Sequence, residues 1–273
     1  MEELVGERMK THLEILGRIK IIEGDCRTVL PTLAPASVDL IYIDPPFNTG
    51  NEQTLHGRSY SDTHEDYRLF MDECLRLAKD VMKPRSSIFV HLDFREAHHV
   101  RMLLDTIFGA GCFQNEIIWS YDFGGRSKKR WPRKHNNIYW YTKNAEDWTF
   151  NYDAIDRIPY RAPKFALAMD AGKTQMDIER GKIPTDVWWN TIVHFSEGGT
   201  LYPTQKPQRL LRRIVEVHSN KGDVLLDFFA GSGSFGQAAV DYGRQVILVD
   251  NNSQAIEVML KRFSAVTSPI SCL

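Results

Sequence analysis

The sequence predicts an α/β protein built on a mostly parallel sheet, because two kinds of segment alternate along most of the 273 residues. One kind is short and apolar, as is typical of buried strands, and the other is amphipathic with a helical period. Such alternation is typical of a doubly wound sheet with helices on both faces. A chain of this length buries about 75% of its unfolded surface, so neither disulfides nor a structural metal is needed.

The first half of the chain contains most of the strands. We expect strands at 19–25, 38–44, 87–92, 113–121 and 137–143, and helices at 67–83 and 96–109. Proline lacks a backbone N–H, so Pro45 and Pro46 end the second strand and Pro84 ends the first helix.

Helical and strand periodicity fades between residues 145 and 200, where prolines and glycines are frequent. We therefore expect an insertion or small subdomain in this part of the chain. Regular α/β alternation returns with helices at 207–219, 234–242 and 253–263 and strands at 223–229 and 245–250.

The composition excludes several classes of protein. Lys and Arg total 34 against 35 Asp and Glu, so the net charge of −1 indicates no particular partner. No apolar segment reaches the roughly 18 residues that span a membrane, and the acidic N-terminus lacks a signal-peptide core. The four cysteines form no C-x-x-C pair, and we expect no metal site and a cytoplasmic protein with reduced thiols.

A glycine-rich turn follows the expected strand at 223–229. Gly231, Gly233 and Gly236 form a G-x-G-x-x-G motif between a strand and a helix, and Asp250 ends the next strand 19 residues after Gly231. This arrangement is typical of a site for an adenosine-containing cofactor, in which the acidic residue binds ribose hydroxyls. A dinucleotide and S-adenosylmethionine both fit it. Asp227 favours S-adenosylmethionine, because a carboxylate there would repel a pyrophosphate and attract the ammonium group of methionine.

A second motif, Asp44-Pro45-Pro46-Phe47, follows the buried strand at 38–44 directly. Ligands bind at the carboxyl ends of strands in open α/β sheets. The Asp44 carboxylate and a nearby backbone carbonyl would accept both hydrogens of an exocyclic amine and orient its nitrogen for attack. Two prolines remove N–H donors and stiffen the segment, and Phe47 offers a flat face on which an extruded base would stack.

Together these two motifs resemble the β group of DNA amino-methyltransferases, in which the catalytic motif precedes the cofactor motif. The resemblance implies a Rossmann-like methyltransferase fold, with a mixed seven-stranded sheet, helices on both faces, a small recognition insert and a permuted motif order. It implies one catalytic domain made of residues 19–144 (catalytic half) and 201–265 (cofactor half), with 145–200 as a target-recognition insert. Aspartate at position 44, where cytosine-modifying members usually carry serine or asparagine, resembles adenine-modifying members.

The resemblance assigns roles to individual residues. It implies catalysis by Asp44, Pro45, Pro46 and Phe47. It implies binding of S-adenosyl-L-methionine by Asp25, Cys26, Asp44, Thr204, Lys206, Asp227, Phe228, Phe229, Ala230, Gly231, Ser232, Gly233, Asp250 and Asn251. The resulting prediction is site-specific transfer of a methyl group to the 6-amino group of adenine in duplex DNA, by base flipping and direct transfer. A cytosine 4-amino methyltransferase and, more distantly, an NAD-dependent oxidoreductase remain as alternatives.

A basic loop between the strands at 113–121 and 137–143 is a candidate DNA contact. It carries Arg126, Lys128, Lys129, Arg130, Arg133 and Lys134. Such a loop would neutralise phosphates and bind without regard to sequence, although a solvated hairpin loop has the same composition. The expected partner is double-stranded DNA. The resemblance also brings a homodimer and a companion restriction endonuclease into consideration.

Overall fold

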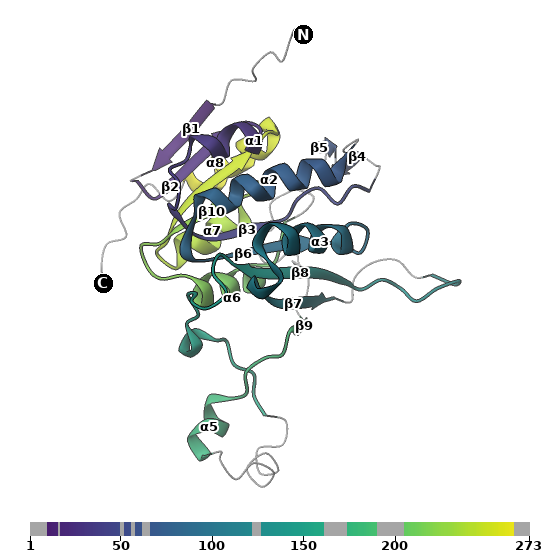
Figure 1. The fold of residues 1–273 in the computed structure, drawn as a ribbon, viewed down its shortest axis with the longest axis vertical. Helices are drawn as coiled ribbons and strands as arrows, with labels where there is room; N and C mark the ends of the chain where they lie inside the picture. The colour runs from purple at the N-terminus through teal and green to yellow at the C-terminus, as the bar shows by residue number, and fades with distance from the viewer. Residues whose placement is uncertain are drawn as a thin grey trace.

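The computed structural model describes residues 10–15, 17–49, 52–55, 58–61, 66–121, 127–160, 174–189 and 205–264. Its centre is a nine-stranded sheet in the order β1-β2-β11-β10-β3-β6-β8-β7-β9 (Figure 1). The strands are β1 (Lys10–Ile15), β2 (Ile19–Glu23), β3 (Val38–Ile43), β6 (Met82–Leu92), β7 (Phe113–Ser120), β8 (His135–Thr142), β9 (Val187–Trp189), β10 (Val224–Asp227) and β11 (Gln245–Asp250). A separate hairpin, β4 (Glu52–Leu55) and β5 (Arg58–Ser61), lies between β3 and the next helix in the chain.

The sheet has the predicted mixed character but more strands than the seven expected. Strands β2, β11, β10, β3 and β6 run parallel, and β8 is reversed between β6 and β7. The two additional strands lie at the edges, where β1 pairs antiparallel with β2 and β9 pairs in parallel with β7. β9 has only three residues, and the first three residues of β1 are all polar, so periodicity did not indicate either strand.

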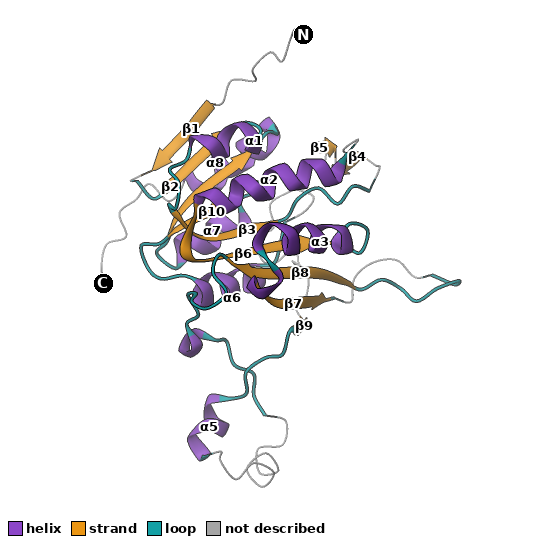
Figure 2. Cartoon of the chain, viewed as in Figure 1, coloured by secondary structure: helices purple, strands orange, loops and turns teal. Residues whose placement is uncertain are grey.

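Helices cover both faces of the sheet, as predicted (Figure 2). One face packs against α1 (Cys26–Val29), α2 (Tyr67–Val81) and α3 (Ala97–Phe108). The other packs against α6 (Gln208–His218), α7 (Ser234–Asp241) and α8 (Ser253–Phe263). The chain leaves α2 and enters β6 at once, so this strand begins earlier than the sequence predicted. No helix in the described parts of the chain is both long and apolar enough to cross a lipid bilayer.

Residues 145–160 and 174–189 of the expected insert, 145–200, are described. Both parts are attached to the main sheet or to the helices that cover it. Asn151 donates its backbone N–H to the carbonyl of Val217 at 2.7 Å, and its side-chain amide donates to two further carbonyls at the end of α6. On the other side, β9 extends the sheet beside β7. Between these attachments, the segment that carries α5 (Gln175–Arg180) projects away from the sheet (Figure 1).

Candidate active site

Three carboxylates lie at the ends of three neighbouring parallel strands. Asp250 ends β11, Asp227 ends β10, and Asp44 follows β3 directly. Because these strands are adjacent and run in the same direction, their carboxyl ends meet at one edge of the sheet. The side chains of Asp44 and Asp227, 183 residues apart in the chain, line the same cavity, as the sequence predicted.

Lys206 lies in this cavity and pairs with Asp44. Its ammonium contacts Asp44 Oδ2, and the two side chains are only 10% and 16% exposed. The other oxygen, Asp44 Oδ1, is buried and has no hydrogen-bond partner within the described structure. Burial raises the pKa of Asp44, and the charge of Lys206 opposes that rise. The site therefore holds a carboxylate oxygen that can accept a hydrogen bond.

Asp227 is the second buried carboxylate of the cavity, with 3% of its surface exposed. Its Oδ1 accepts the backbone N–H of Phe229 at 3.0 Å. Burial raises the pKa of Asp227 well above its ordinary value, and the negative charges of Asp44 and Asp250 raise it further. A cationic group bound beside Asp227 would remove this electrostatic cost.

The glycine-rich turn forms one wall of the cavity and is tied to Asp250. The two oxygens of Asp250 accept the backbone N–H groups of Gly231 at 2.8 Å and Asn252 at 2.9 Å. Gly233 begins α7 in the left-handed region, with φ of 73°. A Cβ added at Gly236 would lie 2.6 Å from Leu248 Cδ1 of β11, so this glycine allows α7 to pack closely on the sheet.

The cavity is lined by half of the fourteen residues predicted to bind the cofactor. Beyond its two carboxylates and Lys206, the cavity is lined by Phe229, Ala230, Gly231 and Ser232. Phe228 instead belongs to the core beneath the opposite face of the sheet and is 1% exposed. The remaining members of the predicted set are Asp25, Cys26, Gly233, Asp250 and Asn251, which do not line this cavity, and Thr204, which lies outside the described residues.

Asp25 and Cys26 follow β2, the neighbour of β11. Asp25 begins α1, where its carboxylate accepts the backbone N–H of Arg27 at 2.8 Å and pairs with the Arg27 guanidinium. Cys26 is buried, and its Sγ lies 3.3 Å from Sγ of Cys74. Both residues therefore lie at the same edge of the sheet as the three carboxylates, one strand beyond Asp250.

The sequence did not single out four residues that also line the cavity, namely Tyr42, Leu211, Ser234 and Phe235. Tyr42 could have been recognised, because residues two apart in a strand face the same side and Tyr42 precedes Asp44 by two. Phe235 stacks on the Tyr42 ring, with centroids 5.3 Å apart.

Phe47 follows Asp44 by three residues and is half-buried. Its ring centroid is 6.2 Å from that of His91, and the Lys206 ammonium lies 5.4 Å from it. The ring of Trp119 lies 5.3 Å from His91, and its buried Nε1 has no hydrogen-bond partner in the described structure. Aromatic rings and a buried carboxylate oxygen without a partner in the described structure thus occur together beside the end of β3.

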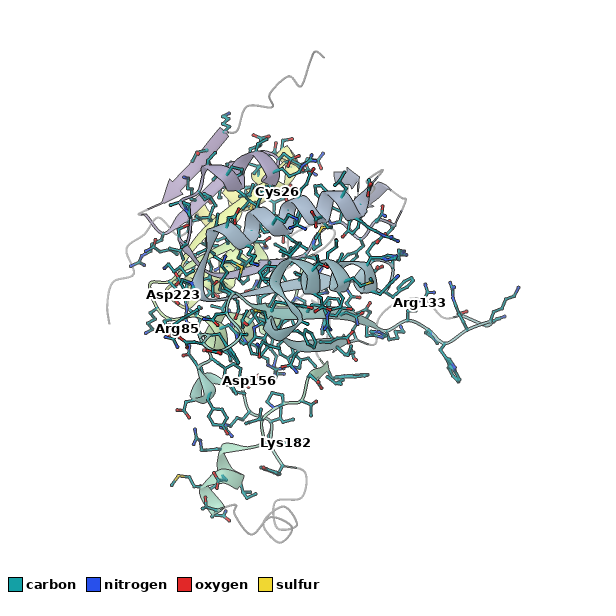
Figure 3. The ribbon with its side chains drawn as sticks, in the orientation of Figure 1. Cys26, Arg85, Arg133, Asp156, Lys182 and Asp223 are labelled. Atoms are coloured by element: carbon teal, nitrogen blue, oxygen red, sulfur yellow. The ribbon has the colours of Figure 1, made fainter. Side chains whose placement is uncertain are left out.

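The basic loop between β7 and β8 is described from residue 127 onward, so Arg126 lies outside the described residues. The loop extends away from the sheet, with Arg133 near its base (Figure 3). The side chains of Lys128, Lys129 and Arg130 are exposed, and Lys134 is half-buried. The Arg133 guanidinium lies 3.5 Å from the centre of the Phe94 ring, and Trp131 is 92% exposed. The exposed cations can therefore reach a polyanion.

Comparison with known proteins identifies the family. Residues 38–261 match the DNA methylase family. The chain is 30% identical to the DNA adenine methyltransferase YhdJ of Escherichia coli (strain K12) over 249 residues, covering 89% of this chain and 81% of YhdJ. It is 29% identical to the type II methyltransferase M.HpaI of Haemophilus parainfluenzae over 253 residues, covering 90% of this chain and 74% of M.HpaI.

Solved structures share the fold. The PvuII DNA methyltransferase (cytosine-N4-specific) superposes with a TM-score of 0.65 at 14% identity, covering 94% of this chain and 88% of that structure. Two further structures of this fold are complexes with S-adenosylmethionine. A strand-end carboxylate on each side of one cavity, a glycine-rich turn and the family match lead to one conclusion. The chain belongs to the DNA methylase family and is an S-adenosylmethionine-dependent DNA methyltransferase.

Proposed function

We propose that this enzyme methylates the 6-amino group of adenine in duplex DNA, at a specific sequence, after flipping the base out of the helix. The observation that carries the proposal is the buried oxygen of Asp44, which has no partner among the described residues, in the cavity that also contains Asp227. The similarity to an adenine methyltransferase over 89% of the chain supports adenine as the base. Aspartate at position 44 supports the same choice.

The cavity residues fit S-adenosylmethionine, which supplies an electrophilic sulfonium methyl group when bound. We propose that Asp227 binds its ammonium group, since a cation would offset the cost of burying that carboxylate. The Asp250 carboxylate accepts backbone N–H groups of the turn, and its two oxygens together offer about four lone-pair sites, which leaves room for a ribose hydroxyl. Asp25 and Cys26, one strand farther along, are proposed to bind the adenine end of the cofactor.

On the DNA side, Asp44 Oδ1 and a backbone carbonyl of the Asp44–Pro45 segment would accept the two hydrogens of the target amine. This holds the amine nitrogen at the methyl donor and stabilises the positive charge that develops on it. Phe47 would stack on the extruded base, which offsets part of the few kcal/mol that base flipping costs. The exposed cations of the basic loop would bind phosphates.

We retain the predicted division of the chain, with residues 19–144 and 201–265 as the catalytic domain and 145–200 as the recognition insert. The projection of the segment between Asn151 and β9 supports a separate role for it. A homodimer and a companion restriction endonuclease are further proposals. The endonuclease is supported by the similarity to M.HpaI, a type II methyltransferase.

Transfer of a tritiated methyl group to plasmid DNA, followed by digestion and mass identification of the modified nucleoside, tests the function. We expect N6-methyladenine; N4-methylcytosine would identify the alternative base.

Asp44→Ala should lower turnover by at least about 100-fold, because it removes an acceptor used in the reaction. Binding of S-adenosylhomocysteine, measured by calorimetry, should remain. Asp72→Ala, on the surface of α2, is the control and should retain full activity. Loss of cofactor binding in Asp44→Ala would contradict the assigned role.

A further inference from the structure

A buried row of four hydrogen-bonded side chains crosses four adjacent strands beneath the active site. We call Tyr121, Asn136, His91 and Tyr42 the cross-strand row; they come from the end of β7 and from β8, β6 and β3. Tyr121 Oη donates to Asn136 Oδ1 at 2.9 Å, Asn136 Nδ2 lies 2.9 Å from His91 Nε2, and His91 Nδ1 lies 2.8 Å from Tyr42 Oη. Sequence separation between His91 and its two partners is 45 and 49 residues, so the fold alone assembles the row.

The row has a definite direction. An amide nitrogen only donates, so His91 Nε2 must accept the hydrogen of Asn136 Nδ2. Burial and the charge of Lys206 lower the pKa of His91 well below its ordinary value, so the ring is neutral near pH 7. A neutral imidazole carries one hydrogen, which must then be on Nδ1 and be donated to Tyr42 Oη. Tyr42 Oη therefore accepts a hydrogen from His91, and its own hydroxyl hydrogen is available for another acceptor.

The charged groups around Tyr42 favour an orientation in which its hydroxyl hydrogen points into the cavity. Tyr42 lines the cavity with Asp44 and Asp227 and is itself buried. Burial raises the pKa of Tyr42, the negative charges of these two carboxylates raise it further, and the same charges favour a hydroxyl hydrogen that points toward them. Stacking on Phe235 fixes the plane of the ring. The cavity therefore receives one neutral, oriented O–H donor.

We propose that Tyr42 donates its hydroxyl hydrogen to the carboxylate of the methionine part of the cofactor, and that the cross-strand row fixes this direction. The inference rests on the proposed assignment of this cavity to the methionine part of S-adenosylmethionine. That part is a zwitterion and needs an acceptor for its ammonium group and donors for its carboxylate. Asp227 is the acceptor. Among the donors in the cavity, the Lys206 ammonium uses one of its three hydrogens on Asp44, and the Tyr42 hydroxyl adds a neutral donor whose direction is set by its bond with His91.

A pair of ligands that differ only by the carboxylate tests this contact. Calorimetry with the full chain would compare S-adenosylhomocysteine and its decarboxylated analogue, S-adenosyl-3-thiopropylamine. Tyr42→Phe should weaken S-adenosylhomocysteine about 10-fold, as expected for a hydrogen bond to a charged group, and leave the analogue unchanged. Tyr141→Phe is the matched control, because it removes a buried hydroxyl that bonds Asp105 far from the cavity; it should change neither affinity.

Two additional measurements separate the possible failures. Asp227→Asn should weaken both ligands, since both contain the ammonium group. If it weakens neither, the assignment of the cavity is wrong; if it weakens both while Tyr42→Phe weakens neither or both equally, only the present inference is overturned. Independently, ¹⁵N NMR of the imidazoles, with the His91 signal assigned from its loss in His91→Phe, should show hydrogen on Nδ1 and none on Nε2. The opposite tautomer would overturn the proposed direction even if a variant failed to fold.

Discussion

Replacing Lys206 with methionine would test how the enzyme keeps Asp44 ionised. The substitution approximately preserves side-chain length but removes the ammonium that pairs with Asp44 Oδ2. Burial already raises the pKa of Asp44, and the charge of Lys206 opposes that rise. Two unit charges about 4 Å apart interact by about 4 kcal/mol at an effective dielectric constant near 20. At about 1.4 kcal/mol per pH unit, this corresponds to an increase in pKa of up to about 3 units.

The pH dependence of single-turnover methyl transfer, with DNA and cofactor saturating, measures this increase. Asp44 can accept amine hydrogens only as a carboxylate, so activity is present above its pKa and is lost as the pH falls through it. The acid limb of Lys206→Met should therefore lie at higher pH than that of the wild type, by up to about 3 pH units. Lys206→Arg keeps the charge and should leave the limb in place. Coincident acid limbs for wild type and Lys206→Met would refute the reasoning.

Three further perturbations have defined outcomes. Asp227→Asn removes a buried carboxylate whose folded pKa is raised, so wild-type stability falls as pH rises through that pKa. The variant should gain about 1 kcal/mol at pH 8 and less at pH 5 in thermal unfolding, and lose cofactor affinity; an equal effect at both pH values would contradict this. Joint replacement of Lys128, Lys129 and Arg130 by alanine should reduce the salt slope of DNA binding by up to about 3; an unchanged slope would mean that the loop makes no phosphate contacts. Gly236→Ala should destabilise the fold by roughly 1–3 kcal/mol through overpacking, measured by urea unfolding, unless β11 shifts to admit the methyl group.

The sequence predicted the meeting of Asp44, Asp227 and Asp250 because each carboxylate follows an apolar strand of a parallel sheet. Strand direction then brings their ends to one edge, whatever the details of packing. The same logic did not apply to Phe228, because it predicts where a strand end lies but not which of the side chains after it reaches the cavity. Phe228 is buried in the core, whereas Phe229 packs against the same core cluster and also lines the cavity.

The cross-strand row could not be predicted from the sequence, for a different reason. His91 belongs to an apolar strand and gives no local signal for its partners in the neighbouring strands. Which side chains meet across strands depends on register and on the reversed direction of β8, and a shift of one residue would turn Asn136 to the other face. The edge strands β1 and β9 were missed because they are defined by pairing with a neighbour and not by their own periodicity.

The attachment of the projecting segment at both ends has a practical consequence for engineering. Asn151 is hydrogen-bonded to the end of α6, and β9 pairs with β7. Backbone hydrogen bonds to α6 and to the main sheet therefore hold both boundaries of the segment. A chimera that exchanges only the residues between these two points would leave every strand end of the cavity untouched. If the segment is the recognition insert proposed above, grafting the corresponding stretch from a relative with another target sequence would change the target and leave the reaction the same.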